Sequence, residues 1–155
     1  PCCQAGLRVI VCGHSYVFWA TKYAWHSAWI QKLSLGKHSL LDWKGLQGLA
    51  WDGFSDLVSQ SACEASIDVL LVHLGGNDLA RVPDKALILI ADLKRFKRQF
   101  QDTQVIWPII IPHLRWHSAK NSNWMEHACK CVNREVDQVM INGLGSVVNH
   151  PEISP

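Results

Sequence analysis

Short apolar runs alternate along this chain with longer segments in which apolar residues recur every three or four positions. Four of the runs are rich in branched aliphatic residues and stop beside a turn-forming residue. This pattern predicts strands that are buried on both faces, as in a parallel sheet. The predicted strands cover residues 7–12, 67–74, 104–111 and 146–149, and a further short strand is expected within the glycine-rich stretch 45–53.

The segments between the strands have the spacing of amphipathic helices. In one of them Leu89, Leu93, Phe96 and Phe100 recur so that they share one helix face. Because helices alternate with strands, the order predicts a parallel sheet with right-handed crossovers and a three-layer α/β/α sandwich. The predicted helices cover residues 16–33, 54–62, 83–100 and 123–143, and residues 34–44 are predicted to form a loop.

The helix predicted after the first strand is apolar over much of its circumference. A stripe of small residues that suits close packing on a sheet is formed by Val17, Ala20, Ala24 and Ala28. A second, aromatic stripe is formed by Phe18, Trp25 and Trp29. A well-buried helix is favoured here over an exposed aromatic surface.

Composition indicates a single domain spanning residues 1–155, because 155 residues with 48% hydrophobic content can bury a sizeable core. A formal net charge of +2 does not point to nucleic acid or an anionic membrane as a partner. No apolar run approaches the ~20 residues that cross a bilayer. The cluster of basic residues in the 83–100 helix is assigned to a solvated face rather than to an anion-binding patch; its members are Lys94, Arg95, Lys97 and Arg98.

The six cysteines have no spacing that suggests a disulfide framework, which favours a reducing, intracellular compartment. No signal-peptide pattern precedes the first strand. His127, Cys129 and Cys131 lie close together in a predicted helix, but they lack the four-ligand spacing of a zinc site. The sequence therefore predicts no metal and no cofactor.

Candidate chemistry lies where three predicted strands end. Ser15 follows the first strand, Gly48 lies in the glycine-rich stretch, and Asn77 follows the strand at 67–74. Acyl transfer needs a nucleophilic hydroxyl and donors that face the developing oxyanion. Ser15 supplies the hydroxyl, while its own N–H, the Gly48 N–H and the Asn77 amide supply three donors. The competing interpretation of Ser15 is a serine that caps the N-terminus of the following helix.

These residues resemble the motifs of the SGNH hydrolases, the GDSL-like esterases. The Gly-His-Ser turn at 13–15 matches the first family block, and Gly-Gly-Asn-Asp at 75–78 matches the third. Gly48 matches the glycine block, with Gly53 as a competitor. The resemblance covers nearly the whole chain and implies a flavodoxin-like five-stranded fold that hydrolyses esters of small acylated substrates. It assigns Ser15 as the nucleophile and Gly48 and Asn77 to the oxyanion hole, without a cofactor.

The chain departs from the family pattern at two places. His14 stands where the family usually has aspartate, and the general-base histidine of the family, within an Asp-x-x-His block after the fifth strand, has no counterpart. The chain ends near the place where that block should begin, so the domain is expected to be truncated at its C-terminus. His150 follows the last strand and is the candidate substitute, although Val147 replaces the upstream aspartate.

The other histidines are given different roles. His14 is expected to point away from Ser15 and to have a structural or supporting role, and His73 is expected to be a satisfied core histidine. His113 and His117 follow the fourth strand and are possible substrate-lining residues.

Two functions follow from this resemblance. The first is an SGNH-type serine esterase whose histidine base is supplied from elsewhere, and the alternative is an inactive binding or structural module. The tryptophan-rich sequence around the motifs is also similar to esterase-like domains carried by vertebrate transposable elements.

Overall fold

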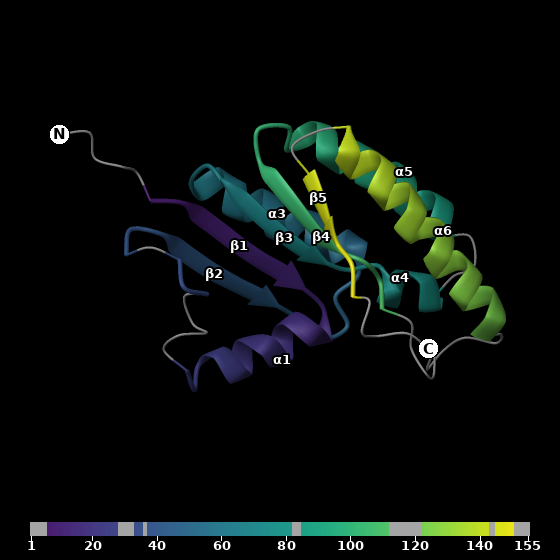
Figure 1. The fold of residues 1–155 in the computed structure, drawn as a ribbon, viewed down its shortest axis with the longest axis horizontal. Helices are drawn as coiled ribbons and strands as arrows, with labels where there is room; N and C mark the ends of the chain where they lie inside the picture. The colour runs from purple at the N-terminus through teal and green to yellow at the C-terminus, as the bar shows by residue number, and fades with distance from the viewer. Residues whose placement is uncertain are drawn as a thin grey trace.

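A computed structural model describes residues 6–27, 33–35, 37–81, 85–111, 122–142 and 145–150. Its centre is a five-stranded, all-parallel sheet with the order β2-β1-β3-β4-β5 (Figure 1). The predicted α/β/α class and five-stranded parallel sheet are confirmed. The strands are β1 (Arg8–Gly13), β2 (Leu40–Gly45), β3 (Val69–His73), β4 (Gln104–Pro108) and β5 (Gly145–Val148). The helices are α1 (Ser15–Ala24), α3 (Trp51–Glu64), α4 (Gly76–Arg81), α5 (Lys85–Gln99) and α6 (Ser122–Ile141).

The hydrophobic core lies between the sheet and helices α3, α5 and α6. Alternation along each strand sends Ile10, Leu70 and Trp107 to this face, where all three are fully buried. Right-handed crossovers place α1 on the opposite face, because the chain moves from β1 to β2 in the reverse direction. The core side chains from these helices include Phe54, Val58, Leu89, Leu93, Phe96, Val132 and Val136, and Phe100 follows α5 directly.

The second strand differs from the prediction. Residues 34–44 were expected to form a loop and the second strand to lie within 45–53, yet β2 begins at Leu40 and pairs in parallel with β1 only as far as Gly45. The strand lies at the edge of the sheet and is mostly half-buried, so it does not need a continuous apolar run. Its exposed side carries an ion pair between Asp42 and Lys44, whose atoms are 3.1 Å apart.

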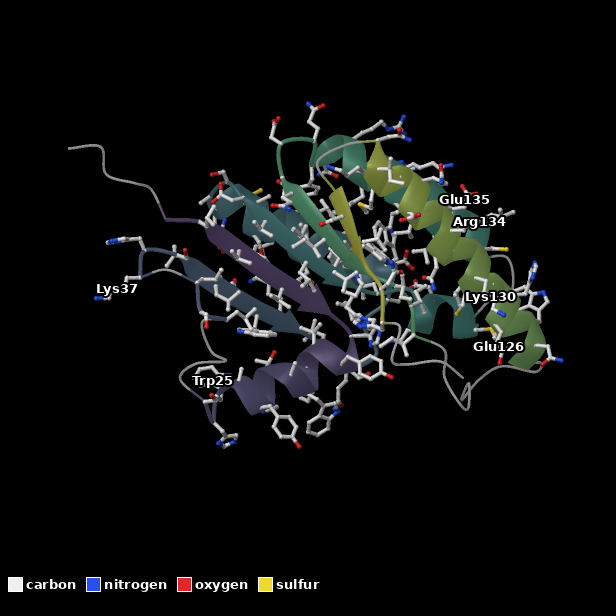
Figure 2. All side chains as sticks on the ribbon, viewed as in Figure 1. Trp25, Lys37, Glu126, Lys130, Arg134 and Glu135 are labelled. Atoms are coloured by element: carbon white, nitrogen blue, oxygen red, sulfur yellow. The ribbon has the colours of Figure 1, made fainter. Side chains whose placement is uncertain are left out.

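The first helix is less buried than predicted. Val17 and Ala24 are buried as expected, but Ala20 is exposed, Phe18 is only half-buried and the other aromatic side chains face solvent. The reason is that α1 covers only β1 and β2, so its far side has no other layer against it within the described residues. Trp25, at the end of α1, is labelled in Figure 2. The exposed fractions are 44% for Tyr16, 54% for Trp19, 74% for Tyr23 and 72% for Trp25.

Several element ends also shift. Pro108 interrupts the strand predicted at 104–111, and the strand ends there, because the proline ring nitrogen cannot donate to a neighbouring strand. Helix α3 starts three residues before the predicted 54–62 helix. Helix α1 ends at Ala24, before the predicted end at residue 33, and Leu33 lies in a turn. Residues 28–32 lie outside the described residues, as do 82–84 and 143–144, which contain predicted helix ends.

Two glycines allow α1 to pack directly on the sheet. Gly13 and Gly45 are register partners at the carboxyl ends of β1 and β2. A Cβ at Gly45 would overlap the backbone of Val17 and Phe18 in α1. A Cβ at Gly13 would lie 2.6 Å from the carbonyl oxygen of His73. This glycine pair therefore sets how closely the start of α1 approaches the sheet.

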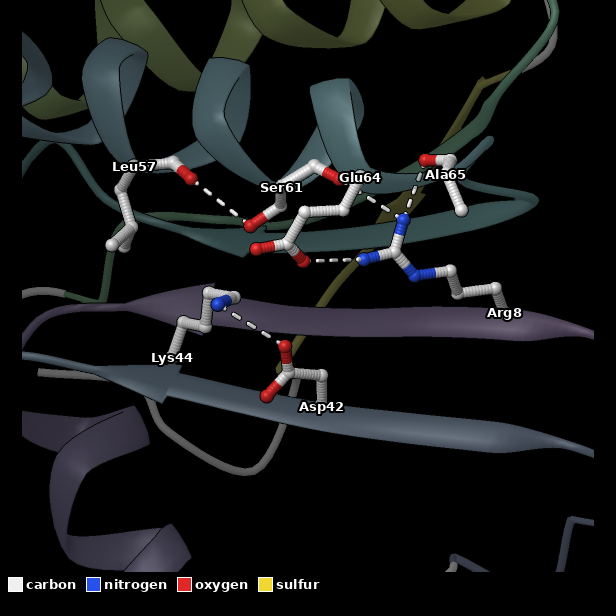
Figure 3. A network of polar contacts seen from close by, with 7 residues as sticks. All are labelled: Arg8, Asp42, Lys44, Leu57, Ser61, Glu64 and Ala65. Atoms are coloured by element: carbon white, nitrogen blue, oxygen red, sulfur yellow. Dashed lines mark hydrogen bonds and ion pairs between the residues drawn. The ribbon is translucent and has the colours of Figure 1, made fainter.

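The opposite end of β1 is fixed by Arg8. Its guanidinium donates hydrogen bonds to the carbonyl oxygens of Ser61, at 3.0 Å, and Ala65 (Figure 3). It also pairs with Glu64 at 3.3 Å. A cation here satisfies carbonyl groups at the end of α3 and complements the helix dipole. This network joins the start of β1 to the end of α3, at the end of the strand that lies away from Ser15.

Candidate active site

Ser15 stands at the junction between β1 and α1. The strand ends at Gly13, and the helix begins at Ser15 with His14 as its N-cap residue. Since Ser15 is the first helical residue, the interpretation of Ser15 as the capping serine is wrong. His14 makes no capping hydrogen bond through its side chain either. The Ser15 hydroxyl is therefore not engaged in holding the helix end.

His14 is directed toward Ser15, which corrects the prediction that it points away. Its Nδ1 atom lies 3.3 Å from Ser15 Oγ, and the residue is only 4% exposed. The turn is held from β3, because the His14 backbone N–H donates to the carbonyl oxygen of His73 at 3.3 Å. The His14 ring is buried among aromatic rings and lies toward the hydroxyl rather than away from it.

Two aromatic side chains pack against the His14 ring. The His73 ring centroid is 4.8 Å away and the Tyr16 centroid is 5.3 Å away. Tyr16 and His73 also meet edge to face at 5.3 Å. His73 is buried as predicted, but it is the last residue of β3, so it lies beside the candidate site rather than deep in the core.

Gly48 and Gly53 occupy different kinds of backbone. Gly48 lies in the loop after β2 with a φ of +71°, a left-handed conformation that favours glycine, and the space beside its Cα is open. Gly53 lies within α3, where a Cβ would meet only the flexible end of Leu49 at 3.3 Å. Of the two, Gly48 is the glycine at the carboxyl edge of the sheet.

Asn77 and Asp78 join the start of α4 to the loop that carries Gly48. The Asn77 amide donates to the carbonyl oxygen of Leu49 at 2.9 Å, and Asp78 accepts from the backbone N–H of Trp51 at 3.0 Å. A carboxamide has two N–H donors, so one bond to Leu49 leaves a second available. The bond of Asp78 agrees with a role in holding the loop.

The three predicted site residues follow three adjacent strands. Ser15 comes after β1, Gly48 after β2 and Asn77 after β3, and β1 lies between the other two (Figure 1). The loops are also connected directly, since the Leu46 N–H donates to the carbonyl oxygen of Gly13 at 3.0 Å. Ligands of open α/β sheets bind at this carboxyl edge.

Of the three remaining candidate histidines, His150 alone lies within the described residues. His150 follows β5 and is half-buried, with β3 and β4 between its strand and β1. His113 and His117 lie outside the described residues. His14 is thus the histidine whose orientation differs from the prediction, and its signal was a histidine beside Ser15 where the family that the sequence resembles has aspartate.

A separate hollow of about 570 Å³ lies between α5 and α6. Its lining includes Lys94, Lys97, Arg98 and Glu135, and none of the predicted site residues. Lys97 was assigned to a solvated face, but it is only 8% exposed, and burial lowers its pKa despite the attraction of Asp102. Its ammonium group donates to the carbonyl oxygen of Phe100 at 3.4 Å.

The thiols of the described residues show no metal-binding arrangement. Cys12 and Cys129 are buried, and burial raises the pKa of each thiol to about 12. Cys131 Sγ lies 3.6 Å from His127 Nε2. Across the described part of the chain, no group of three or more histidine, cysteine or acidic side chains is placed to hold a metal ion. Within the same residues, no helix is long and apolar enough to span a membrane.

Comparison with known proteins gives matches in structure alone. No protein-family model matches the sequence, and a search of curated proteins finds no relative. A GDSL-like lipase from Bacteroides thetaiotaomicron superposes with a TM-score of 0.67 at 15% identity, over 92% of this chain and 67% of the lipase. An acetyl xylan esterase from Geobacillus stearothermophilus gives 0.62 at 14% identity, over 91% of this chain and 76% of the esterase.

A gut microbial diltiazem-metabolizing enzyme gives a TM-score of 0.68 at 12% identity, over 93% of this chain. This chain spans only 36% of that enzyme's length. None of these names bears on the similarity to domains of transposable elements, which stays a prediction. The chain has the α/β fold of the SGNH, or GDSL-like, esterases.

Proposed function

We propose that this chain is a serine ester hydrolase of the SGNH type, acting on small acylated substrates through Ser15. The observation that carries the proposal is that Ser15, Gly48 and Asn77 follow three adjacent parallel strands, at the carboxyl edge of the sheet. A nucleophilic hydroxyl beside donors for an oxyanion is the arrangement that acyl transfer needs. The esterase names among the structural matches favour an ester as the substrate.

In the proposed reaction, Ser15 Oγ attacks the ester carbonyl and forms a tetrahedral oxyanion. The N–H groups of a helix's first turn have no partner within the helix, so the Ser15 N–H can serve as one donor to that oxyanion. The Gly48 N–H and the Asn77 amide are the other proposed donors. Loss of the alcohol leaves an acyl group on Ser15, which water then releases. No metal or cofactor takes part in this scheme.

Hydrolysis of p-nitrophenyl acetate by the purified chain tests this function. We expect release of p-nitrophenol well above the rate in buffer and above that of heat-denatured protein. Release of p-nitrophenol no faster than in buffer or with heat-denatured protein would contradict the proposal that the chain is an ester hydrolase.

The alternative function is a non-catalytic binding or structural module with the same fold. One observation favours it, namely that no Asp-x-x-His sequence occurs in the chain. Removing one member of a catalytic triad typically lowers activity by several orders of magnitude. Absence of turnover, together with an intact fold, would be the result expected for this module.

Replacing Asn77 with alanine should lower kcat for the aryl ester by ~10²–10³-fold, the usual cost of one oxyanion donor. KM should change little, because the donor acts on charge that develops in the transition state. Asn133→Ala is the matched control, since Asn133 also bonds backbone, at Ile110 with 2.8 and 3.1 Å, but lies on α6. Equal losses of kcat in the two variants would argue against Asn77 as a donor.

Alanine at Gly48 and at Gly53 should separate the two candidate glycines. At Gly48, with its φ of +71°, a side chain costs ~1–2 kcal/mol of backbone strain and displaces the N–H. We expect kcat/KM to fall ~10-fold or more, because small misplacements of a donor are costly. Gly53→Ala should leave kcat/KM within about 2-fold, since its helical N–H does not move. The reverse ranking in steady-state kinetics would identify Gly53 as the donor.

A further inference from the structure

We infer that His14 is the general base that activates Ser15, in place of the histidine expected after the fifth strand. This inference rests on the proposed function and names a further catalytic residue for it. His14 precedes its nucleophile directly in the sequence, so base and nucleophile come from a single turn. The assignment makes the site independent of an Asp-x-x-His block.

The distance supports the assignment. His14 Nδ1 is 3.3 Å from Ser15 Oγ, close to the 2.6–3.2 Å range of a working pair, and such contacts are often longer before substrate binds. Nδ1 must be the unprotonated nitrogen, so the ring must carry its proton on Nε2.

The surroundings hold the ring in this orientation. His73 packs on it at 4.8 Å and Tyr16 at 5.3 Å, and the His14 backbone is bonded to the end of β3. Gly13 makes this possible, because any side chain there would collide with the His73 carbonyl oxygen and with Val17. A buried ring held by its neighbours is better oriented than a histidine on a free loop.

The proton then follows a closed path. As Ser15 Oγ bonds to the carbonyl carbon, its proton moves to His14 Nδ1. When the tetrahedral intermediate collapses, the bond to the alcohol breaks and Nδ1 returns the proton to the leaving oxygen. In the second half of the reaction, water attacks the acyl group on Ser15 and gives one proton to His14 Nδ1. When the bond between Ser15 Oγ and the acyl carbon breaks, Nδ1 passes this proton to Oγ and restores the Ser15 hydroxyl. The net reaction consumes one ester and one water and yields an acid and an alcohol.

Three other titratable groups could contribute to the pH dependence of kcat/KM, and the test must distinguish them from His14. His73 on β3 and Tyr16 on α1 face the His14 ring, and His150 follows β5. Tyrosine titrates near pH 10, whereas an imidazole titrates between about pH 5 and 8. A base that must be neutral gives a kcat/KM that rises with pH through the imidazole range.

The experiment measures kcat/KM for p-nitrophenyl acetate between about pH 5 and 9, for wild type and for His14→Gln, His73→Gln and His150→Ala. His14→Gln should lower kcat/KM by ~10²–10⁴-fold and remove the rise with pH. His73→Gln and His150→Ala should keep the rise. His14→Asp is a second variant, and it carries the residue that is common in the family. Thermal unfolding of each variant checks that it is folded.

Two results would overturn the inference in distinguishable ways. If Ser15→Ala abolishes turnover while folded His14→Gln or His14→Asp retains the wild-type pH profile, the proposed function stands and His14 is not the base. If the rise of kcat/KM with pH is kept in the His14 variants but disappears in His150→Ala or His73→Gln, His14 is likewise not the base. If wild type shows no Ser15-dependent turnover at any pH, the proposed function itself fails, and the role of His14 with it.

Discussion

Replacing Ser15 with alanine should lower kcat/KM for p-nitrophenyl acetate by ~10³-fold or more, about 4 kcal/mol of transition-state stabilisation. The physical reason is that the hydroxyl oxygen forms the covalent bond to the acyl group, and no other atom of the turn replaces it. The fold should be unaffected, because Ser15 is not the helix cap and alanine is a good helix former. We therefore expect unfolding free energies that agree within about 0.5 kcal/mol.

Thr21→Ala provides the control for this substitution. Thr21 also lies in α1, but its hydroxyl donates to the carbonyl oxygen of Val17 at 2.7 Å within the helix. Removing that hydroxyl should leave kcat/KM within about 3-fold, since Thr21 lies almost two turns from the junction. Turnover by Ser15→Ala at the rate of Thr21→Ala would show that the hydrolysis does not use Ser15.

Replacing Gly45 with alanine should give the largest loss of stability among single-methyl additions in this region. The new Cβ would overlap backbone atoms of Val17 and Phe18, which cannot rotate away as a side chain can. Overpacking of this kind costs about 1–3 kcal/mol, and we expect the upper end. For a domain of this size the melting temperature should fall by about 6–10 °C. Since α1 begins with Ser15, kcat/KM should fall as well.

Gly53→Ala is the matched control for Gly45→Ala. The added methyl meets only Leu49 Cδ1 at 3.3 Å, and it lies in a helix, where alanine is favoured over glycine by about 0.5–1 kcal/mol. Thermal unfolding followed by circular dichroism should show a neutral or slightly raised midpoint. A Gly45→Ala midpoint equal to that of Gly53→Ala would mean that α1 does not sit on the glycine pair.

The sequence predicted the architecture because the buried strands and amphipathic helices have strong, regular patterns. Strand β3 follows from a run of branched aliphatic residues, and the buried face of α5 from Leu89, Leu93, Phe96 and Phe100. Strand β2 was predicted too late in the chain, because an edge strand buries only part of its surface and carries Asp42 and Lys44. The exposure of α1 was missed since periodicity does not reveal how much of a helix its neighbours cover.

The sequence motifs predicted which residues lie at the candidate site, but they did not predict the contacts between the side chains there. The ends of three strands located Ser15, Gly48 and Asn77 at one edge, since adjacency follows from a parallel sheet. The direction of the His14 ring was not predictable, because it depends on His73, which lies 59 positions away and reaches it only through the β1–β3 pairing. Tertiary packing decides such an orientation.

Covalent labelling of the chain with a fluorophosphonate, which reacts with activated serine hydroxyls, tests most directly whether Ser15 is the nucleophile. Intact-mass measurement should show one adduct per chain, and tryptic mapping should place it in the peptide that spans residues 9–22 and contains Ser15. Ser15→Ala should remain unlabelled under the same conditions. No adduct on the folded wild type, or an adduct that persists in Ser15→Ala, would contradict the assignment of Ser15 as the nucleophile.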